Sequence, residues 1–178
     1  MINPWSPVLG FDEAADERVF LLIDAARDES LYPILYDLDD DDGLEIRCLY
    51  QGETAERLAE VAPYLVALTP GNEAARRLYE LVWDRGWGII LQSALSIDET
   101  RRHLRKFTIA FTEAGKGLIF RFYDPFVLRI FLPTCRPADA QALIGPLRWV
   151  APGSGAGEAT IHEVVEGRAR TTTVTLAP

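Results

Sequence analysis

Residues that bind metals, form disulfides or act as catalytic bases are scarce in this sequence of 178 residues, which has only two cysteines and two histidines. Cys48 and Cys135 both lie in apolar stretches, so we expect two buried free thiols in a reducing compartment and no disulfide. His103 and His162 have no cysteine nearby, and no Gly-x-Ser-x-Gly motif precedes a helix. We therefore expect no catalytic residues, since a nucleophile needs a positioned base.

Sequence patterns that hold cofactors are missing as well. There is no cluster of Cys and His at metal-ligand spacing, no Gly-rich phosphate loop after a strand and no Walker motif. The acidic run at 37–42 fails as an EF-hand, because its two possible registers place Cys48 or Leu49 where the twelfth-position Glu is needed. We expect no metal and no cofactor, and we interpret this run, with Gly43, as a solvated turn.

Basic charge and long apolar runs are also in short supply. The chain has 18 Lys and Arg against 27 Asp and Glu, a net charge of −9, which disfavours nonspecific binding to nucleic acid or anionic lipid. No apolar run approaches the roughly 20 residues that cross a bilayer, and the first residues lack the basic and apolar regions of a signal peptide. We expect a cytoplasmic protein without membrane insertion.

The sequence has the composition of a folded protein, with 48% hydrophobic and 25% charged residues. Strands alternate with helices until a hairpin, which predicts an α/β fold with a mixed β-sheet flanked by helices and a C-terminal strand pair after a Gly-rich linker. The expected parts are an N-terminal arm (1–17), the α/β domain (18–150), the linker (151–157) and the strand pair (158–178). The expected strands are 19–23, 45–50, 64–68, 87–91, 107–111, 118–123, 160–165 and 168–176, and the expected helices are 29–36, 54–61, 73–83, 137–143, one from Ser96 and one after Asp124.

We interpret the stretch 117–125 as a folding hub, where a bulky strand runs straight into an apolar helix. Leu118, Phe120 and Phe122 are expected on one face of the strand. Asp124 is a good N-cap and Pro125 suits the first helical position, so a helix should start there. Asp24 ends the first strand. We interpret the polar residues at these two points as a structural hinge network, made of Asp24, Arg27, Arg121, Tyr123, Asp124 and Pro125.

Three features could contact a partner. The helix after Ser96, which has a capping box with Glu99, has a basic side formed by Arg101, Arg102 and Arg105. Such a face could meet an acidic patch, although a charged run is often only solvated. Trp5, a lone aromatic in the N-terminal arm, could dock on a partner or on the protein's own core. The late strand pair could also accept a partner strand at its edge.

The order and spacing of several short segments resemble the effector adaptor (chaperone) family of bacterial type VI secretion, which is catalogued as a domain of unknown function. The resemblance covers about residues 19–150. In chain order the matching segments are 21–27, 47–50 with Gly52, 62–66, 87–91 with Ser93, 103–105, 120–125, 127–129, Gly145-Pro146 and Trp149.

The resemblance implies a protein that is not an enzyme. Members of this family bind a toxic effector and load it onto the VgrG spike before secretion, so it implies an effector and VgrG as partners and no catalytic residues or cofactor. Two alternatives stay open. One is a small hydrolase or transferase that uses Asp24, His103 and Asp124, which would have to converge in a concave pocket. The other is an immunity protein that neutralises a toxin.

Overall fold

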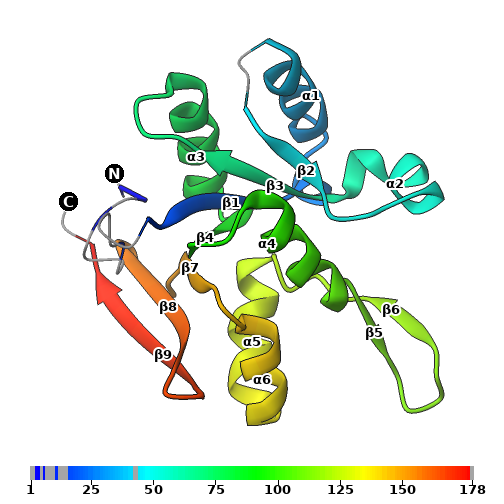
Figure 1. Ribbon diagram of the computed structural model, residues 1–178, viewed down its shortest axis with the longest axis vertical. Coiled ribbons are helices and arrows are strands. Elements are labelled where there is room, and N and C mark those ends of the chain that lie inside the picture. Colours follow the sequence, from blue (N-terminus) through cyan, green and yellow to red (C-terminus); the bar gives the residue numbers. More distant parts are fainter. Residues whose placement is uncertain (1–2, 5, 7–10, 12–15, 42–43, 177–178) are drawn as a thin grey trace.

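The computed structural model describes residues 3–4, 6, 11, 16–41 and 44–176. Its main feature is a seven-stranded sheet in the order β2-β3-β1-β4-β7-β8-β9, and a small sheet of β5 and β6 projects away from the body (Figure 1). The strands are β1 (Arg18–Asp24), β2 (Ile46–Cys48), β3 (Pro63–Leu68), β4 (Gly88–Ser93), β5 (Ile109–Phe111), β6 (Gly117–Ile119), β7 (Arg148–Pro152), β8 (Glu158–Val165) and β9 (Arg168–Thr175).

The α/β class, the flanking helices and the C-terminal strand pair are confirmed. The expected mixture of parallel and antiparallel strands is not found, because every strand pair in the described residues is antiparallel. The segment from β3 through a helix to β4 does make a crossover between parallel strands. However, β1 lies between β3 and β4 and pairs with both, so the parallel strands never become neighbours.

Strand β1 is the centre of the sheet and is buried on both faces, as its continuous apolar run predicts. Alternate side chains enter two separate cores. Leu21 and Ile23 pack in the first core with side chains from α1 (Leu31–Asp41) and α3 (Glu73–Arg85). Phe20 and Leu22 pack in the second core with α4 (Ile97–Leu104), α5 (Pro125–Thr134) and α6 (Pro137–Ile144).

Local capping signals place several helices correctly. Ser96 caps α4 and forms the expected capping box with Glu99, and Asp124 caps α5 with Pro125 in its first turn. Among the described residues, the remaining helical elements are α2 (Glu53–Arg57) and three short 3-10 helices, η3 (Ala25–Arg27), η4 (Ala59–Val61) and η5 (Arg105–Phe107).

The acidic run is not the turn that its composition predicts. Helix α1 continues to Asp41, so residues 37–41 are its last turns, while residues 42–43 lie outside the described part. Leu35 is buried in the first core and Leu38 packs against it. These apolar contacts extend the helix, although acidic residues at a helix C-terminus are electrostatically unfavourable.

The strand expected at 118–123 ends early. Strand β6 stops at Ile119, and Phe122 and Tyr123 are both buried although they are consecutive, so the expected alternation does not hold. The reason is a turn in which the Asp124 N–H donates to the Arg121 carbonyl at 3.0 Å. The turn leads directly into α5, so Phe120 and Phe122 do not share a strand face with Leu118.

The C-terminal strand pair continues the large sheet. Ala151 and Pro152, expected in the linker, instead end β7 and pair with Thr160 and Ala159. Only residues 153–157 form the connection, where the Glu158 carboxylate accepts a hydrogen bond from the Gly155 N–H at 2.9 Å. The strands β8 and β9 therefore belong to the same sheet as β1.

Burial of His162 gives the fold a defined response to acid. This side chain of β8 is 5% exposed, its Nδ1 lies 2.9 Å from the Thr171 hydroxyl, and burial lowers its pKa from 6.5 to about 4. The folded protein thus keeps a neutral imidazole where the unfolded chain takes up a proton. The contribution of this group to stability is complete above pH 6.5 and is lost as the pH falls towards 4, by at most about 3 kcal/mol.

We therefore expect the free energy of unfolding, measured in urea at pH 7.5 and pH 5.0, to fall less in His162→Gln than in the native protein. Other titrating groups are common to both proteins and cancel in the comparison. An identical pH dependence in the two would contradict the burial argument.

Candidate functional site

The hinge network brings together residues that are far apart in the chain. Asp24 ends β1 with its side chain fully buried and accepts a hydrogen bond from the Ala26 N–H at 3.3 Å, which caps η3. The Arg121 Nε donates to Asp24 Oδ2 at 3.0 Å, and Arg121 Nη2 donates to the same oxygen. Arg121 thereby neutralises a carboxylate at the end of the central strand.

A second acid–base pair continues this network. Asp124 Oδ1 accepts the Phe126 N–H at 2.9 Å at the start of α5, while its Oδ2 accepts from Arg27 Nη1 at 3.3 Å. Arg121 Nη2 lies 3.8 Å from the same Oδ2. Two arginines and two aspartates therefore alternate in the order Arg27, Asp124, Arg121, Asp24, and their charges balance.

The titration properties of the network fit a structural role. Burial raises the pKa of Asp24, although hydrogen bonds from Arg121 oppose that rise. Tyr123 is also buried, and its hydroxyl lies 3.4 Å from the Tyr50 hydroxyl. Burial and this hydrogen bond raise the pKa of Tyr123, so the phenol stays protonated. The ion pairs of the hinge network join the end of β1 to the start of α5.

His103 does not join the two carboxylates. Its Nε2 lies 2.9 Å from the Leu143 carbonyl, and its ring packs with Phe107. Its ring also lies so close to Gly145 that a Cβ atom on this residue would be 2.7 Å from the His103 Nε2. The contacts of His103 in the described residues are therefore with α6 and η5, and the convergence required by the hydrolase hypothesis is not seen there.

The basic side of α4 divides into residues with different roles. Arg101, expected to face a partner, instead donates from Nε to the Cys48 carbonyl at 2.7 Å and from Nη2 to the Tyr50 carbonyl at 3.2 Å. It fastens α4 to the end of β2. Arg102 is exposed and Arg105 is half-buried, so these two remain available at the surface.

The predicted contact of Trp5 lies outside the described residues. Its neighbour Pro4 is described and buried, and the Pro4 carbonyl accepts a hydrogen bond from the buried Gln92 side chain at 3.0 Å. At this point the N-terminal arm lies on β4.

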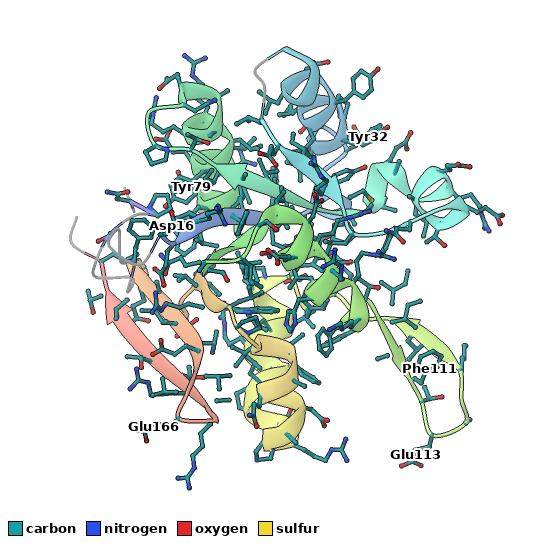
Figure 2. All side chains as sticks on the ribbon, viewed as in Figure 1. Asp16, Tyr32, Tyr79, Phe111, Glu113 and Glu166 are labelled. Atoms are coloured by element: carbon teal, nitrogen blue, oxygen red, sulfur yellow. The ribbon has the colours of Figure 1, made fainter. Side chains whose placement is uncertain are left out.

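Sequence reasoning missed an exposed apolar surface on the small sheet. The hairpin surface consists of Ile109, Phe111, Leu118 and Ile119, which are 52%, 74%, 48% and 56% exposed. Ile109 pairs with Ile119 and Phe111 with Gly117, so three of the four apolar side chains share one face. Phe111 lies on the outer part of the hairpin, as Figure 2 shows. Apolar residues at consecutive positions of both strands were the available signal, because they leave no polar face for solvent.

Helix α5 adds a second exposed apolar area. Phe126 and Ile130, one helical turn apart, are 63% and 54% exposed, and we call them the α5 face. The hairpin and the helix are connected by Phe120, whose ring centroid lies 4.6 Å from that of Phe131.

The described residues contain neither a group of potential metal ligands nor a membrane-spanning helix. No group of three or more His, Cys, Asp or Glu side chains is arranged to hold a metal ion within the ranges that the structure covers. None of the helices described has both the length and the apolar character required to span a lipid bilayer.

Comparison with protein families gives one match, over residues 19–142, to the family described as a domain of unknown function (DUF4123). The chain belongs to this family. No curated protein and no solved structure matches the chain. The DUF4123 region contains the hinge network, the hairpin surface and the α5 face, and it ends before β7.

The ion pair between Asp24 and Arg121 can be tested by replacing the arginine. Arg121→Met leaves the buried Asp24 carboxylate without its cation, and we expect a loss of about 2–3 kcal/mol at pH 8. The side chain of Arg121 is 37% exposed, so water compensates in part. Without Arg121 the pKa of Asp24 rises further. Protonation of this acid should therefore make the loss smaller at pH 5, as measured by urea unfolding.

A second variant separates charge from packing. Asp24→Asn in the Arg121→Met background keeps an acceptor for the Ala26 N–H and should recover most of the stability at pH 8. Arg136→Met, which breaks the exposed pair with Asp139, serves as the control and should cost no more than about 0.5 kcal/mol. Equal losses for Arg121→Met at both pH values would disprove a buried ionised partner.

Proposed function

We propose that this DUF4123 protein is a cytoplasmic adaptor, or chaperone, that binds a type VI secretion effector and loads it onto the VgrG spike. It acts by non-covalent binding and transforms no substrate. The proposal combines the resemblance of the short segments with the surface properties of the fold.

The hairpin surface is the observation that supports this function best. Exposed apolar side chains that cluster on one element typically mark an interaction site, and each Å² of apolar area removed from water by a partner contributes about 25 cal/mol. The surface lies on a projecting element (Figure 1), where a partner can reach both faces of the hairpin. A role in folding would instead require these side chains to be covered.

An adaptor needs a second surface, and the outer edge of β9 is suited to that purpose. Within the described part of the sheet, β9 has a neighbour on one side only, and seven of its eight residues are exposed. Such an edge can add a strand from another protein. Because β8 contributes buried residues such as Ala159 and Ile161 to the first core, this edge should be tested by point substitution and not by deletion of residues 158–178.

We expect the double variant Phe111→Ser/Ile119→Ser to lose co-purification with one of the two partners, effector or VgrG, while the other still binds through a separate surface. Both side chains are more than half exposed, so the change in stability should be small, about 0.5 kcal/mol or less. Tyr36→Ser on α1, which removes an aromatic side chain that is 61% exposed, is the matched control. Unchanged binding of both partners would exclude the hairpin surface.

The cellular role is tested by loss of the gene. An adaptor is required in the attacking cell, so its deletion should abolish effector delivery while the secretion apparatus still assembles. Expression in the recipient cell should give no protection. Protection of the recipient with normal delivery would instead identify an immunity protein.

A further inference from the structure

Basic residues are concentrated around the hairpin of an otherwise acidic protein. Between residues 101 and 130 the sequence has seven Lys and Arg against two acidic residues, whereas the whole chain has a net charge of −9. Charge of one sign that gathers beside an apolar surface indicates the charge of the partner.

Several of these cations have no acidic partner within the chain. Arg121 is held by two aspartates, and Arg101 is bound to backbone carbonyls. In contrast, five cations form no ion pair with any described carboxylate, namely Arg102, Arg105, Lys106, Lys116 and Arg129. Elsewhere in the described chain most arginines are paired, as Arg76 is with Glu73 and Glu80, and the exceptions are Arg18, Arg85 and Arg168.

The unpaired cations border the apolar areas. Lys106 lies in η5, just before the hairpin, and Lys116 immediately precedes β6. Arg129 is exposed on α5, three residues after Phe126 and therefore beside it on the helix surface. Apolar contact and positive charge are thus available to the same ligand.

We infer that the hairpin surface and the α5 face bind a segment of another protein in which apolar side chains are bordered by Asp or Glu. This inference rests on the proposed function and specifies the chemistry of one of its partners. The apolar side chains of the segment cover the hairpin, and its carboxylates pair with Lys106, Lys116 and Arg129.

An anionic membrane fits the same surface less well. The tip of the hairpin, residues 112–116, contains no large apolar side chain, and Glu113 lies at its far end (Figure 2). Insertion of the hairpin into a bilayer would move this polar tip into hydrocarbon, which is unfavourable. The net charge of −9 would also repel an anionic bilayer.

A second copy of the chain is disfavoured by the same cations. A symmetric contact between two hairpins would place the basic border of one molecule near the same basic border of the other. Like charges at an interface are unfavourable. An acidic border on the partner removes this repulsion.

The full-length protein can be tested with two fluorescein-labelled peptides that share one central apolar stretch. One peptide has Glu on both flanks and the other has Lys. We expect the Glu-flanked peptide to bind about tenfold more tightly, as a few exposed ion pairs would give, and the difference should shrink when NaCl is raised from about 0.05 M to about 0.5 M. The triple variant Lys106→Glu/Lys116→Glu/Arg129→Glu should reverse the preference. Arg77→Glu, at an exposed position in α3 outside both proposed binding surfaces, should leave it unchanged.

Phe111→Ser/Ile119→Ser should abolish binding of both peptides. Equal affinity for the two peptides, or binding of neither, overturns the inference. Binding of the unmodified protein to vesicles of anionic phospholipid also overturns the inference if Phe111→Ser/Ile119→Ser abolishes that binding. The same holds for dimer formation by the unmodified protein if these substitutions abolish the dimer. If effector and VgrG co-purify with the native protein but the peptides bind equally, this inference alone fails. If neither protein co-purifies while the Glu-flanked peptide is preferred, the proposed function fails and the inference stands.

Discussion

The contact between Asp24 and Arg121 joins the end of the central strand to the segment between the hairpin and α5. A buried carboxylate without a partner is destabilising by several kcal/mol, and Asp24 ends the central strand with its side chain fully buried. Its cation comes from a residue 97 positions later in the chain, immediately after the hairpin. Asp124, which touches the same arginine, begins α5. One ionic contact thus fixes the end of β1, the base of the hairpin and the start of the helix.

Projection of the hairpin follows from this constraint. Because Arg121 is held at the end of β1, the chain turns into α5 and β6 cannot continue as a strand along the body. The hairpin is anchored at its base, where the Phe120 N–H donates to the Thr108 carbonyl at 2.9 Å and the Thr108 hydroxyl donates to the Arg105 carbonyl at 3.1 Å. Beyond this base no element described here covers its apolar side chains, and the net charge of −9 opposes self-association through them.

Signals confined to neighbouring residues predicted the structure well. The apolar run of β1, the capping box at Ser96 and the Asp124-Pro125 start of α5 each depend on residues a few positions apart. The residue types of the hinge network were also recognisable, because a carboxylate that ends a buried strand needs a cation.

Features that depend on distant partners could not be predicted from the sequence. The pattern of α4 does not reveal that Arg101 points to the Cys48 carbonyl while Arg102 is exposed. Similarly, the aromatic run around Phe122 fits the pattern of a strand. The strand ends before it only because the chain turns at Arg121. The exposure of Phe111 was missed because an apolar residue in a hairpin is ordinarily interpreted as core.

The matched family region depends on residues beyond its end. Trp149 of β7 follows residue 142, yet it is fully buried in the second core. Its ring centroid lies 5.6 Å from that of Phe122, and its Nε1 donates to the Ile144 carbonyl at 3.2 Å. Phe122 adjoins the hinge network, so loss of β7 would loosen the core that supports the base of the hairpin. The surface within the family region and the strands that follow it therefore form one structural unit, and binding has to be studied on the whole chain.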